Sequence, residues 1–285
     1  MKHLILCASG LPLEIVEQYS KYTKFFSKAK ITPFTPPVFG PYSSWHHLLT
    51  GSTDIKYHNY FGGPKEFGYL DAHYKTDETP YVWEQIPGTV GVFNFPLSFP
   101  VKKVNGWCVA GGTPASTAKY QLVYPCKLAE ELPDKYITDI FLRSQSILGN
   151  YDLLKDADYY KFHYFKDEVE SLRLDTVLKL CLKNPIDSLF YHTFDPLWTG
   201  ERAKDRQDLN KQLYISFQFI DNIIQTLKVQ FDIEDITVIS NHGKLIKKGL
   251  YEDPSLYEPV GFAASSNSAP SNSTDIAPWL LSKLT

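Results

Sequence analysis

The apolar positions of this chain fall into short continuous runs that alternate with stretches of helical periodicity. Short apolar runs bounded by turn residues are typical of strands buried in a sheet. We therefore expect strands at His3–Cys7, at Thr89–Phe95 and in the segment KVNGWCVAGG, which ends in a glycine turn. Apolar residues three and four positions apart predict helices, here at Pro12–Ala29, Ser44–Leu49, Lys127–Leu148 and Lys166–Leu182. Ser44 is the expected cap of the second of these helices.

The carboxyl-terminal third of the chain gives the clearest alternation of strand and helix. The segments DSLFYHTF and DITVIS read as strands, and STDIAPWLLSKL reads as a final short helix. Between the two strands, Ala203–Val229 has helical spacing at Leu209, Leu213, Phe217, Ile220, Ile224 and Leu227. Strands separated by helices predict an α/β fold, in which helices cover both faces of a mostly parallel central sheet.

One stretch departs from this rhythm. Residues from Gly62 to about Pro87 are rich in Tyr, Gly and Pro, which favours loops. We expect a single domain over residues 1–285 that carries an insertion or cap region at residues 63–185.

Composition limits the possible partners and the cellular setting. The chain has 285 residues, of which 43% are hydrophobic, and a net charge of −3 that gives no general attraction for nucleic acid. No segment approaches the roughly 20 apolar residues of a membrane span, and the short apolar run after Met1 reads as a first buried strand rather than a signal peptide. The cysteines form no C-x-x-C pair and are expected to be reduced core residues of a cytoplasmic protein: Cys7, Cys108, Cys126 and Cys181.

Polar residues cluster where three of the predicted strands end. Asn241 and His242 follow the strand in TVISNHGKL, Ser9 ends LILCASG, and Asp195 ends the strand in FYHTFDPLWTG. Open sheets with helices on both faces place their binding sites at the carboxyl ends of the strands. These residues are therefore the candidates for a site that binds a small-molecule ligand or substrate.

Several segments in this order resemble the type I phosphodiesterase/nucleotide pyrophosphatase branch of the alkaline phosphatase superfamily. WHHLLTGS is similar to the helix that follows that family's nucleophile, with its L-x-T-G. VGVFNFPLSFPVKKVNGWCVAGGTP and YPCKLAEEL are similar to its V-x-W-P stretch and Y-P-P-x-L sequel. DSLFYHTFD resembles the strand that ends in a metal-binding Asp, VISNHG resembles S-D-H-G, and STDIAPWLL resembles the closing D-I-A-P-T-I-L.

The resemblance implies a hydrolase with two divalent metal ions, usually zinc, which polarise phosphoryl oxygens and activate a Thr or Ser nucleophile. Asp195 and His242 match two of that family's seven metal-binding and nucleophile positions. The other positions are replaced: the first-strand Asp by Ser9, the nucleophile by Pro41, the Asp of S-D-H-G by Asn241, the His of D-x-x-x-H by Thr199, and the last His by Tyr257 or Leu256. Because zinc needs about three or four strong ligands, we expect neither a metal ion nor another cofactor.

Two readings of the retained residues follow. In the first, Asp195 and His242 lie at adjacent strand ends and form a carboxylate–imidazole pair, which raises the pKa of His242 and makes it a general base or acid. Hydrogen-bonding residues would line the pocket around the pair: Ser9, Thr199, Asn241 and Tyr257. In the second, Asp195 and His242 are relics that satisfy each other and the nearby backbone.

Other residues near this region are weaker candidates. Of His46 and His47, we expect one to pack and the other to be solvated, with His46 as the one that could face the pocket. Ser43 or Ser44 replaces the nucleophile only if the register slips from Pro41. His192 alternates along a buried strand and is expected in the core, and Trp198 either stacks a ligand ring or closes its loop.

Two classes of function therefore stay open. The chain is either a metal-independent enzyme of a biosynthetic pathway that uses Asp195 and His242, or a catalytically inactive protein that binds a ligand or a partner. A residual metal-dependent phosphodiester hydrolase is the third reading. The polar replacements favour a working pocket, whereas Pro41 favours the inactive protein, because proline has no hydroxyl.

Overall fold

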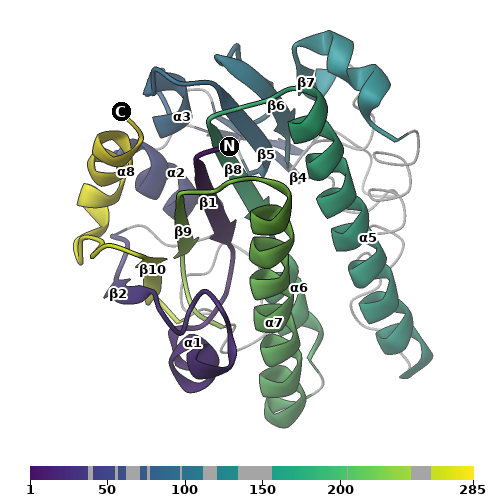
Figure 1. The fold of residues 1–285 in the computed structure, drawn as a ribbon. Coiled ribbons are helices and arrows are strands. Elements are labelled where there is room, and N and C mark those ends of the chain that lie inside the picture. The colour runs from purple at the N-terminus through teal and green to yellow at the C-terminus, as the bar shows by residue number, and fades with distance from the viewer. Residues whose placement is uncertain are drawn as a thin grey trace.

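The structure is a computed structural model in which helices cover both faces of one central sheet (Figure 1). It describes residues 1–37, 41–54, 57–61, 71–75, 78–96, 98–111, 121–133, 156–203, 205–244 and 258–285.

The central sheet has eight strands in the order β2-β10-β9-β1-β8-β5-β6-β7. Their bounds in chain order are β1 (His3–Ala8), β2 (Lys30–Phe34), β5 (Val90–Phe95), β6 (Gly106–Ala110), β7 (Val123–Tyr124), β8 (Ser188–Thr193), β9 (Asp235–Ser240) and β10 (Gly261–Ser265). The five consecutive strands from β9 to β6 are parallel, while β10, β2 and β7 pair antiparallel at the two sides. The predicted α/β fold with a mostly parallel sheet is confirmed, and the outer strands make the sheet mixed.

A two-stranded sheet pairs β3 (Tyr57–Phe61) with β4 (Asp71–Lys75). The α-helices are α1 (Leu13–Tyr19), α2 (Pro41–Thr50), α3 (Val82–Gln85), α5 (Asp156–Lys183), α6 (Asp195–Arg202), α7 (Arg206–Gln230) and α8 (Ile276–Leu284). Single 3₁₀ segments lie at η1 (Ser20–Tyr22), η4 (Cys126–Glu131) and η6 (Ser273–Asp275).

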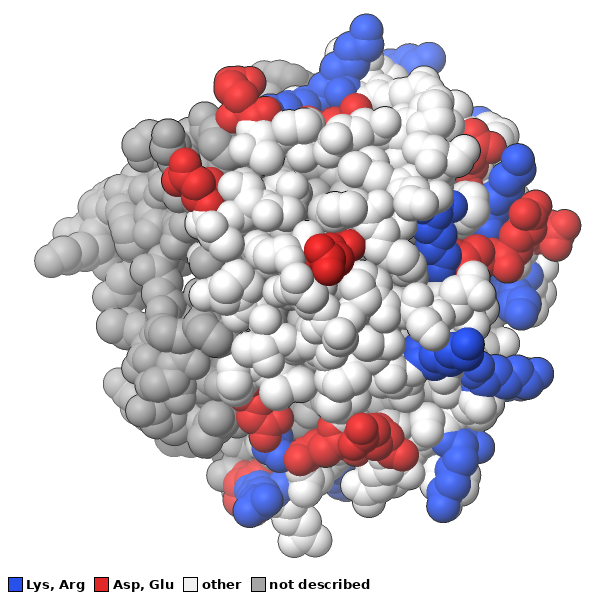
Figure 2. Space-filling view, turned by 90° about the vertical axis from the view of Figure 1, so that its left-hand side faces the viewer, with Lys and Arg blue, Asp and Glu red and all other residues white. Residues whose placement is uncertain are grey.

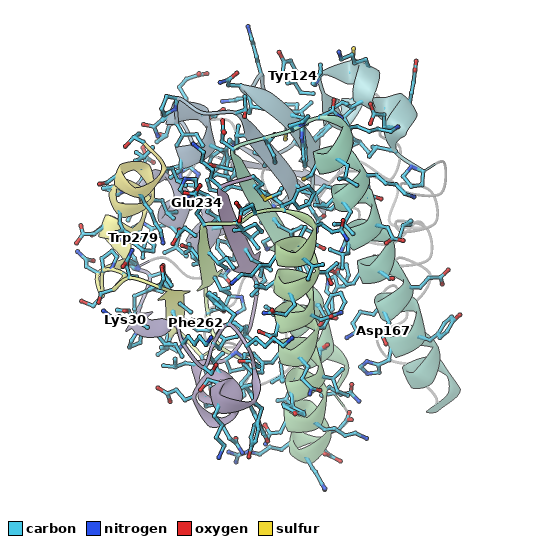
Figure 3. All side chains as sticks on the ribbon, in the orientation of Figure 1. Lys30, Tyr124, Asp167, Glu234, Phe262 and Trp279 are labelled. Atoms are coloured by element: carbon cyan, nitrogen blue, oxygen red, sulfur yellow. The ribbon has the colours of Figure 1, made fainter. Side chains whose placement is uncertain are left out.

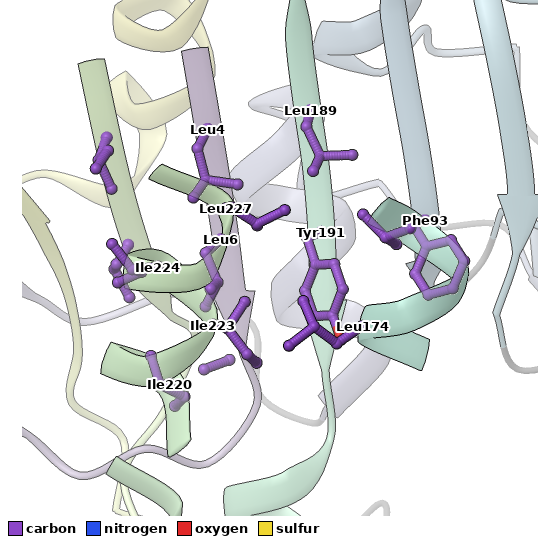
Figure 4. Packing of buried hydrophobic residues seen from close by; sticks show 14 of the residues in the cluster. Leu4, Leu6, Phe93, Leu174, Leu189, Tyr191, Ile220, Ile223, Ile224 and Leu227 are labelled. Atoms are coloured by element: carbon purple, nitrogen blue, oxygen red, sulfur yellow. The ribbon is translucent and has the colours of Figure 1, made fainter. Parts of the chain in front are cut away.

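Alternating side chains of the central strands build two hydrophobic layers. Successive residues of a strand point to opposite faces, so Leu4 and Leu6 of β1 face one layer and Ile5 and Cys7 face the other. The first layer packs under helices α5 and α7 and is shown in Figure 4, with Leu189 and Tyr191 of β8 meeting Ile220, Ile223, Ile224 and Leu227 of α7. The second layer packs under α2, α3 and α8. The predicted covering of both faces is therefore confirmed.

The long helix α7 begins where an acidic residue caps it. The side chain of Asp205 accepts a hydrogen bond from the backbone N–H of Asp208 at 2.9 Å, which satisfies one of the unpaired donors at the helix start. Its buried residues include five of the six whose spacing predicted the helix: Leu213, Phe217, Ile220, Ile224 and Leu227. The predicted range, 203–229, is close to the observed one.

Two predicted helices end or begin elsewhere. Helix α1 ends at Tyr19 rather than Ala29, and the chain after η1 is held by Asp221 of α7, whose carboxylate accepts from the backbone N–H groups of Lys24 and Phe25 at 3.3 and 3.2 Å. Helix α2 starts at Pro41, and proline suits a first helical turn because its missing N–H is not needed there. Ser44 is consequently inside the helix, and its predicted role as the cap is wrong.

The predicted helix at 127–148 is described only at its start, where η4 is a 3₁₀ helix, and residues 134–155 lie outside the described ranges. The edge strand β2 and its neighbour β10 were not predicted from the sequence. Both are short, and only their place in the sheet distinguishes them from loops.

The expected insertion at residues 63–185 contains parts of the central fold. Strands β5 and β6 lie in this range and pair side by side in the central sheet. Helix α5 begins in the same range and contributes Leu174, Val177 and Leu180 to the first hydrophobic layer. These segments therefore do not form a separate cap, and a cap stays a prediction for the remainder of the range.

Among the described residues, no helix combines the length and apolar character needed to cross a membrane. On the face shown in Figure 2, acidic and basic side chains are interspersed around a mostly uncharged centre. The four cysteines are free thiols; Cys7, Cys108 and Cys181 are buried as predicted, but Cys126 is exposed.

Replacing Leu227 with alanine tests the packing of α7 on the sheet. Leu227 is fully buried, so Leu227→Ala is expected to lower the free energy of unfolding by about 2–5 kcal/mol in urea denaturation. Val229 lies two residues further along the same helix with 81% of its surface exposed, and Val229→Ala is expected to change the value by less than about 0.5 kcal/mol. Equal effects of the two substitutions would contradict the packing described here.

Candidate functional site

The predicted site residues lie where the central strands end. Strand β1 pairs with β8 on one side and β9 on the other, and Ala8 is in register with both Thr193 and Ser240. Ser9 therefore follows the central strand, with Asp195 beyond one neighbour and Asn241 beyond the other. Because β1 lies between β8 and β9, the expectation that Asp195 and His242 occupy adjacent strand ends is wrong.

Asp195 binds a lysine that the sequence did not indicate. The Nζ atom of Lys166, on α5, lies 2.6 Å from Oδ1 of Asp195 at the start of α6. Only 3% of the Lys166 side chain and 2% of the Asp195 side chain are exposed. Asp167, the next residue on α5 (Figure 3), lies 3.5 Å from the same ammonium but is largely exposed. The direct partner of Asp195 is thus an ammonium group rather than the imidazole of His242.

Thr199 joins the same contact from one turn along α6. Its hydroxyl lies 3.3 Å from Nζ of Lys166 and 3.1 Å from the hydroxyl of Ser216 on α7. The structure therefore brings Asp195 and Thr199 together, as the family resemblance implied, on a cation supplied by α5. Burial lowers the pKa of Lys166, but the carboxylates of Asp195, Asp167 and Glu170 together raise it by more, so the net pKa lies above the ordinary lysine value.

A second buried ion pair lies beside the first. Arg173 donates to Glu170 at 2.5 Å, and Glu170 accepts from the hydroxyl of Thr193, the last residue of β8, at 3.0 Å. The guanidinium of Arg173 also lies over the ring of Trp198, 5.1 Å from its centre. Burial raises the pKa of Glu170, and the nearby Asp195 adds to this rise against the effect of Arg173. Trp198 therefore helps to close this region by packing on Arg173.

Ser9 is held by two ring nitrogens on the opposite face of the sheet. The indole N–H of Trp45 donates to Oγ of Ser9 at 2.8 Å, and Nε2 of His192 lies 3.0 Å from the same oxygen. Burial, and then the charge of Arg173, hold the pKa of His192 well below its usual range, so this ring is neutral.

A serine beside a neutral histidine has the contact of a nucleophile and its base, but a working pair also needs a group that orients the base. Nδ1 of His192 has no hydrogen-bond partner among the described residues, and Ser9 and His192 are fully buried. The predicted core position of His192 is confirmed, and its contact with Ser9 is a hydrogen bond within the core.

Asn241 and His242 make separate contacts after β9. The amide of Asn241 donates to Oγ of Ser44 on α2 at 2.8 Å, and Nδ1 of His242 lies 2.8 Å from the carbonyl oxygen of Gly243. Burial lowers the pKa of His242 to about 4, and its backbone hydrogen bond offsets only part of this effect. The expected rise in the pKa of His242 is therefore wrong, because burial outweighs any stabilisation of the charged ring.

The remaining predicted residues are placed as follows. Pro41 is the first residue of α2, Ser43 is half-buried in its first turn, and Tyr257 lies outside the described residues. His46 and His47 are both fully buried, so the expectation that one is solvated is wrong. His46 lies edge-on to Tyr81 with 6.0 Å between ring centres, and His47 bonds to Ser273 beside α8, because α8 packs against α2.

Few potential metal ligands gather among the described residues. Among the described residues, no group of three or more His, Cys, Asp or Glu side chains converges on one point. The positions that the resemblance assigns to metal ligands carry neutral Ser9, Thr199 and Asn241, which are weak ligands for zinc. Asp195 is compensated by Lys166 at 2.6 Å, and a second cation at that oxygen would be repelled.

Sequence reasoning missed Lys166, Glu170 and Arg173. These residues lie three and four positions apart on α5 and share the stripe that continues with Val177 and Leu180 into the hydrophobic layer. Charged residues at the buried positions of a helical stripe are a readable signal, because such charges are buried almost only as pairs.

No protein-family model and no curated protein matches the sequence. Solved structures resemble the fold. Murine ectonucleotide pyrophosphatase/phosphodiesterase 5, as an inactive variant in complex with AMP, matches over 100% of this chain and 95% of its own, with a TM-score of 0.51 and 9% identity. Ps i-CgsB in complex with k-i-k-neocarrahexaose matches over 99% and 71%, with a TM-score of 0.50 and 14% identity.

Phosphonoacetate hydrolase from Sinorhizobium meliloti 1021 in complex with phosphonoformate is also similar, over 85% of this chain and 56% of its own, with a TM-score of 0.45 and 12% identity. At such identities a likeness concerns the fold alone. The two matches with TM-scores of 0.51 and 0.50 extend over essentially the whole of this chain.

The buried neutral ring of His242 makes stability depend on pH. The unfolded chain binds a proton near the ordinary histidine pKa of 6.5, whereas folded His242 binds it only near about 4. Stability is therefore expected to fall as the pH drops from about 6.5 to about 4, by roughly 3 kcal/mol in total for this residue. Urea denaturation across this range should show a weaker pH dependence for His242→Gln. The buried ring of His192 is present in both proteins and contributes equally to their pH dependence. An equal dependence of unfolding free energy on pH in the two proteins would therefore contradict the assignment to His242.

Proposed function

We propose that this chain, whose fold is alkaline-phosphatase-like, is a divergent phosphodiesterase/nucleotide pyrophosphatase-type protein that has lost two-metal hydrolysis and serves as a ligand- or partner-binding domain. One observation carries the proposal. The ammonium of Lys166 lies 2.6 Å from Asp195, the strongest ligand retained from the family pattern, and both side chains are buried.

Chemistry supports this reading over a hydrolase. A two-metal hydrolase needs charged or imidazole ligands on both ions and a hydroxyl at the nucleophile position. Here the nucleophile position is Pro41, and the retained carboxylate is already compensated by a fixed positive charge. A divalent ion would have to displace an ammonium whose side chain is only 3% exposed.

Chemistry also disfavours an acid–base enzyme built on Asp195 and His242. Strand β1 separates the two strand ends, so Asp195 does not orient the imidazole. The pKa of His242 is lowered to about 4, which makes its ring a weak base at neutral pH. These observations favour a structural role for both Asp195 and His242.

The ligand class follows from the fold as a hypothesis. The murine neighbour with a TM-score of 0.51 was solved with AMP, so an adenine nucleotide is the first ligand to test. A small ligand at the carboxyl edge of the sheet would agree with where open α/β sheets bind their ligands. Binding without turnover is the expected behaviour.

The proposal is tested with the purified chain, a nitrophenyl phosphodiester and added zinc, with a chelator as the control. We expect no chelator-sensitive hydrolysis of the phosphodiester. Metal analysis should find less than one zinc ion per chain. Two tightly bound zinc ions per chain, or chelator-sensitive hydrolysis, would overturn the proposal. A rise in melting temperature with AMP, with AMP recovered intact, would identify the bound ligand class.

A further inference from the structure

We infer that Lys166 is the resident cation of the Asp195 site: its ammonium compensates the buried carboxylate and fastens helix α5 to the end of strand β8. The inference deepens the proposed function, because it assigns the charge that replaces a bound metal ion. It rests on the geometry of α5, α6 and β8 in this chain.

The ammonium is surrounded on several sides by oxygen atoms. Nζ of Lys166 lies 2.6 Å from Oδ1 of Asp195, 3.3 Å from Oγ1 of Thr199 and 3.5 Å from Oδ1 of Asp167. A lysine ammonium has three hydrogens, and these three oxygens come from α6 and from α5 itself. The arrangement is that of a cation site in which the cation is attached to the chain.

Asp195 depends strongly on this contact. Its side chain is 2% exposed, and Oδ2 has no hydrogen-bond partner among the described residues. A buried carboxylate without a compensating charge is strongly destabilising, because it has lost most of its contact with water. Lys166 is therefore the group that makes an ionised carboxylate tolerable at this position.

The neighbouring ion pair makes the site a balanced group of four charges. Glu170 and Asp195 are both buried acids, and Lys166 and Arg173 supply the two matching cations from a single helix. Glu170 also bonds to Thr193, and the backbone N–H of Asp195 donates to the same hydroxyl at 3.0 Å. The end of β8 is thus tied to α5 by both pairs, so loss of either cation leaves an unbalanced charge between helix and sheet.

Removal of the lysine side chain should leave a site for a free ammonium ion of matching length. Lys166→Ala keeps Cβ and removes three carbon atoms and the ammonium, which n-propylammonium replaces atom for atom. We expect Lys166→Ala to melt roughly 5–15 °C below the unmodified protein, because it breaks a buried ion pair. Millimolar n-propylammonium chloride should restore part of this loss.

Matched controls separate this effect from general salt effects. Tetramethylammonium chloride carries the same charge without an N–H donor and should not rescue Lys166→Ala. Lys179 is an exposed lysine on the same helix. Lys179→Ala should therefore melt at the same temperature as the unmodified protein, and neither salt should change that temperature. Equal effects of the two salts on Lys166→Ala, or a melting temperature unchanged by the substitution, would overturn the inference.

A double variant keeps the inference testable if Lys166→Ala does not fold. Lys166→Met with Asp195→Leu removes both charges and is expected to melt above either single variant, because neither charge is then left unpaired. If the double variant lost as much melting temperature as the two single variants combined, the two residues would not be coupled.

Failure of these stability tests differs from failure of the proposed function. Chelator-sensitive hydrolysis by the unmodified chain would overturn the proposed function whatever the variants do. The role of Lys166 alone would be overturned if n-propylammonium did not rescue Lys166→Ala and the losses of the two single variants simply added. In that case the unmodified chain would still neither bind zinc nor hydrolyse phosphodiesters.

Discussion

Parallel pairing of β1 with β8 and β9 is the constraint on which the rest of this structure depends. Each residue of β1 from His3 to Ala8 is paired on both sides, so the ends of three strands stand in register at one edge of the sheet. This pairing fixes Ser9, Asp195 and Asn241 near one another and also keeps Asp195 and His242 apart. The same backbone geometry therefore gathers these polar residues and places β1 between the strand ends that carry Asp195 and His242.

Ser9, Asn241 and Asp195 at this edge each bind different neighbours. Ser9 bonds to Trp45 and His192, Asn241 bonds to Ser44, and Asp195 binds Lys166. In a buried environment, a polar group that loses its partner costs more than the bond itself contributes. Helices α2 and α5 provide several of these partners here.

The fold of this chain is shared with solved structures that have little sequence in common with it. Its architecture resembles proteins solved with AMP or with a carbohydrate bound, at identities of 9% and 14%. Alternating strands and helices preserve such an architecture as long as the two hydrophobic layers persist. The charge pattern at the strand ends is free to change, provided that every buried charge keeps a counterion.

The sequence by itself determined the α/β class, the central strands and helix α7, because continuous apolar runs and helical spacing are local signals. It also identified Ser9, Asp195 and Asn241 as polar residues that share one edge of the sheet. Only the tertiary structure decided that β1 separates Asp195 from His242, that Lys166 is the partner of Asp195, and that burial lowers the pKa of His242 to about 4. Strand order, long-range ion pairing and desolvation depend on residues far apart in the chain, so no local pattern records them.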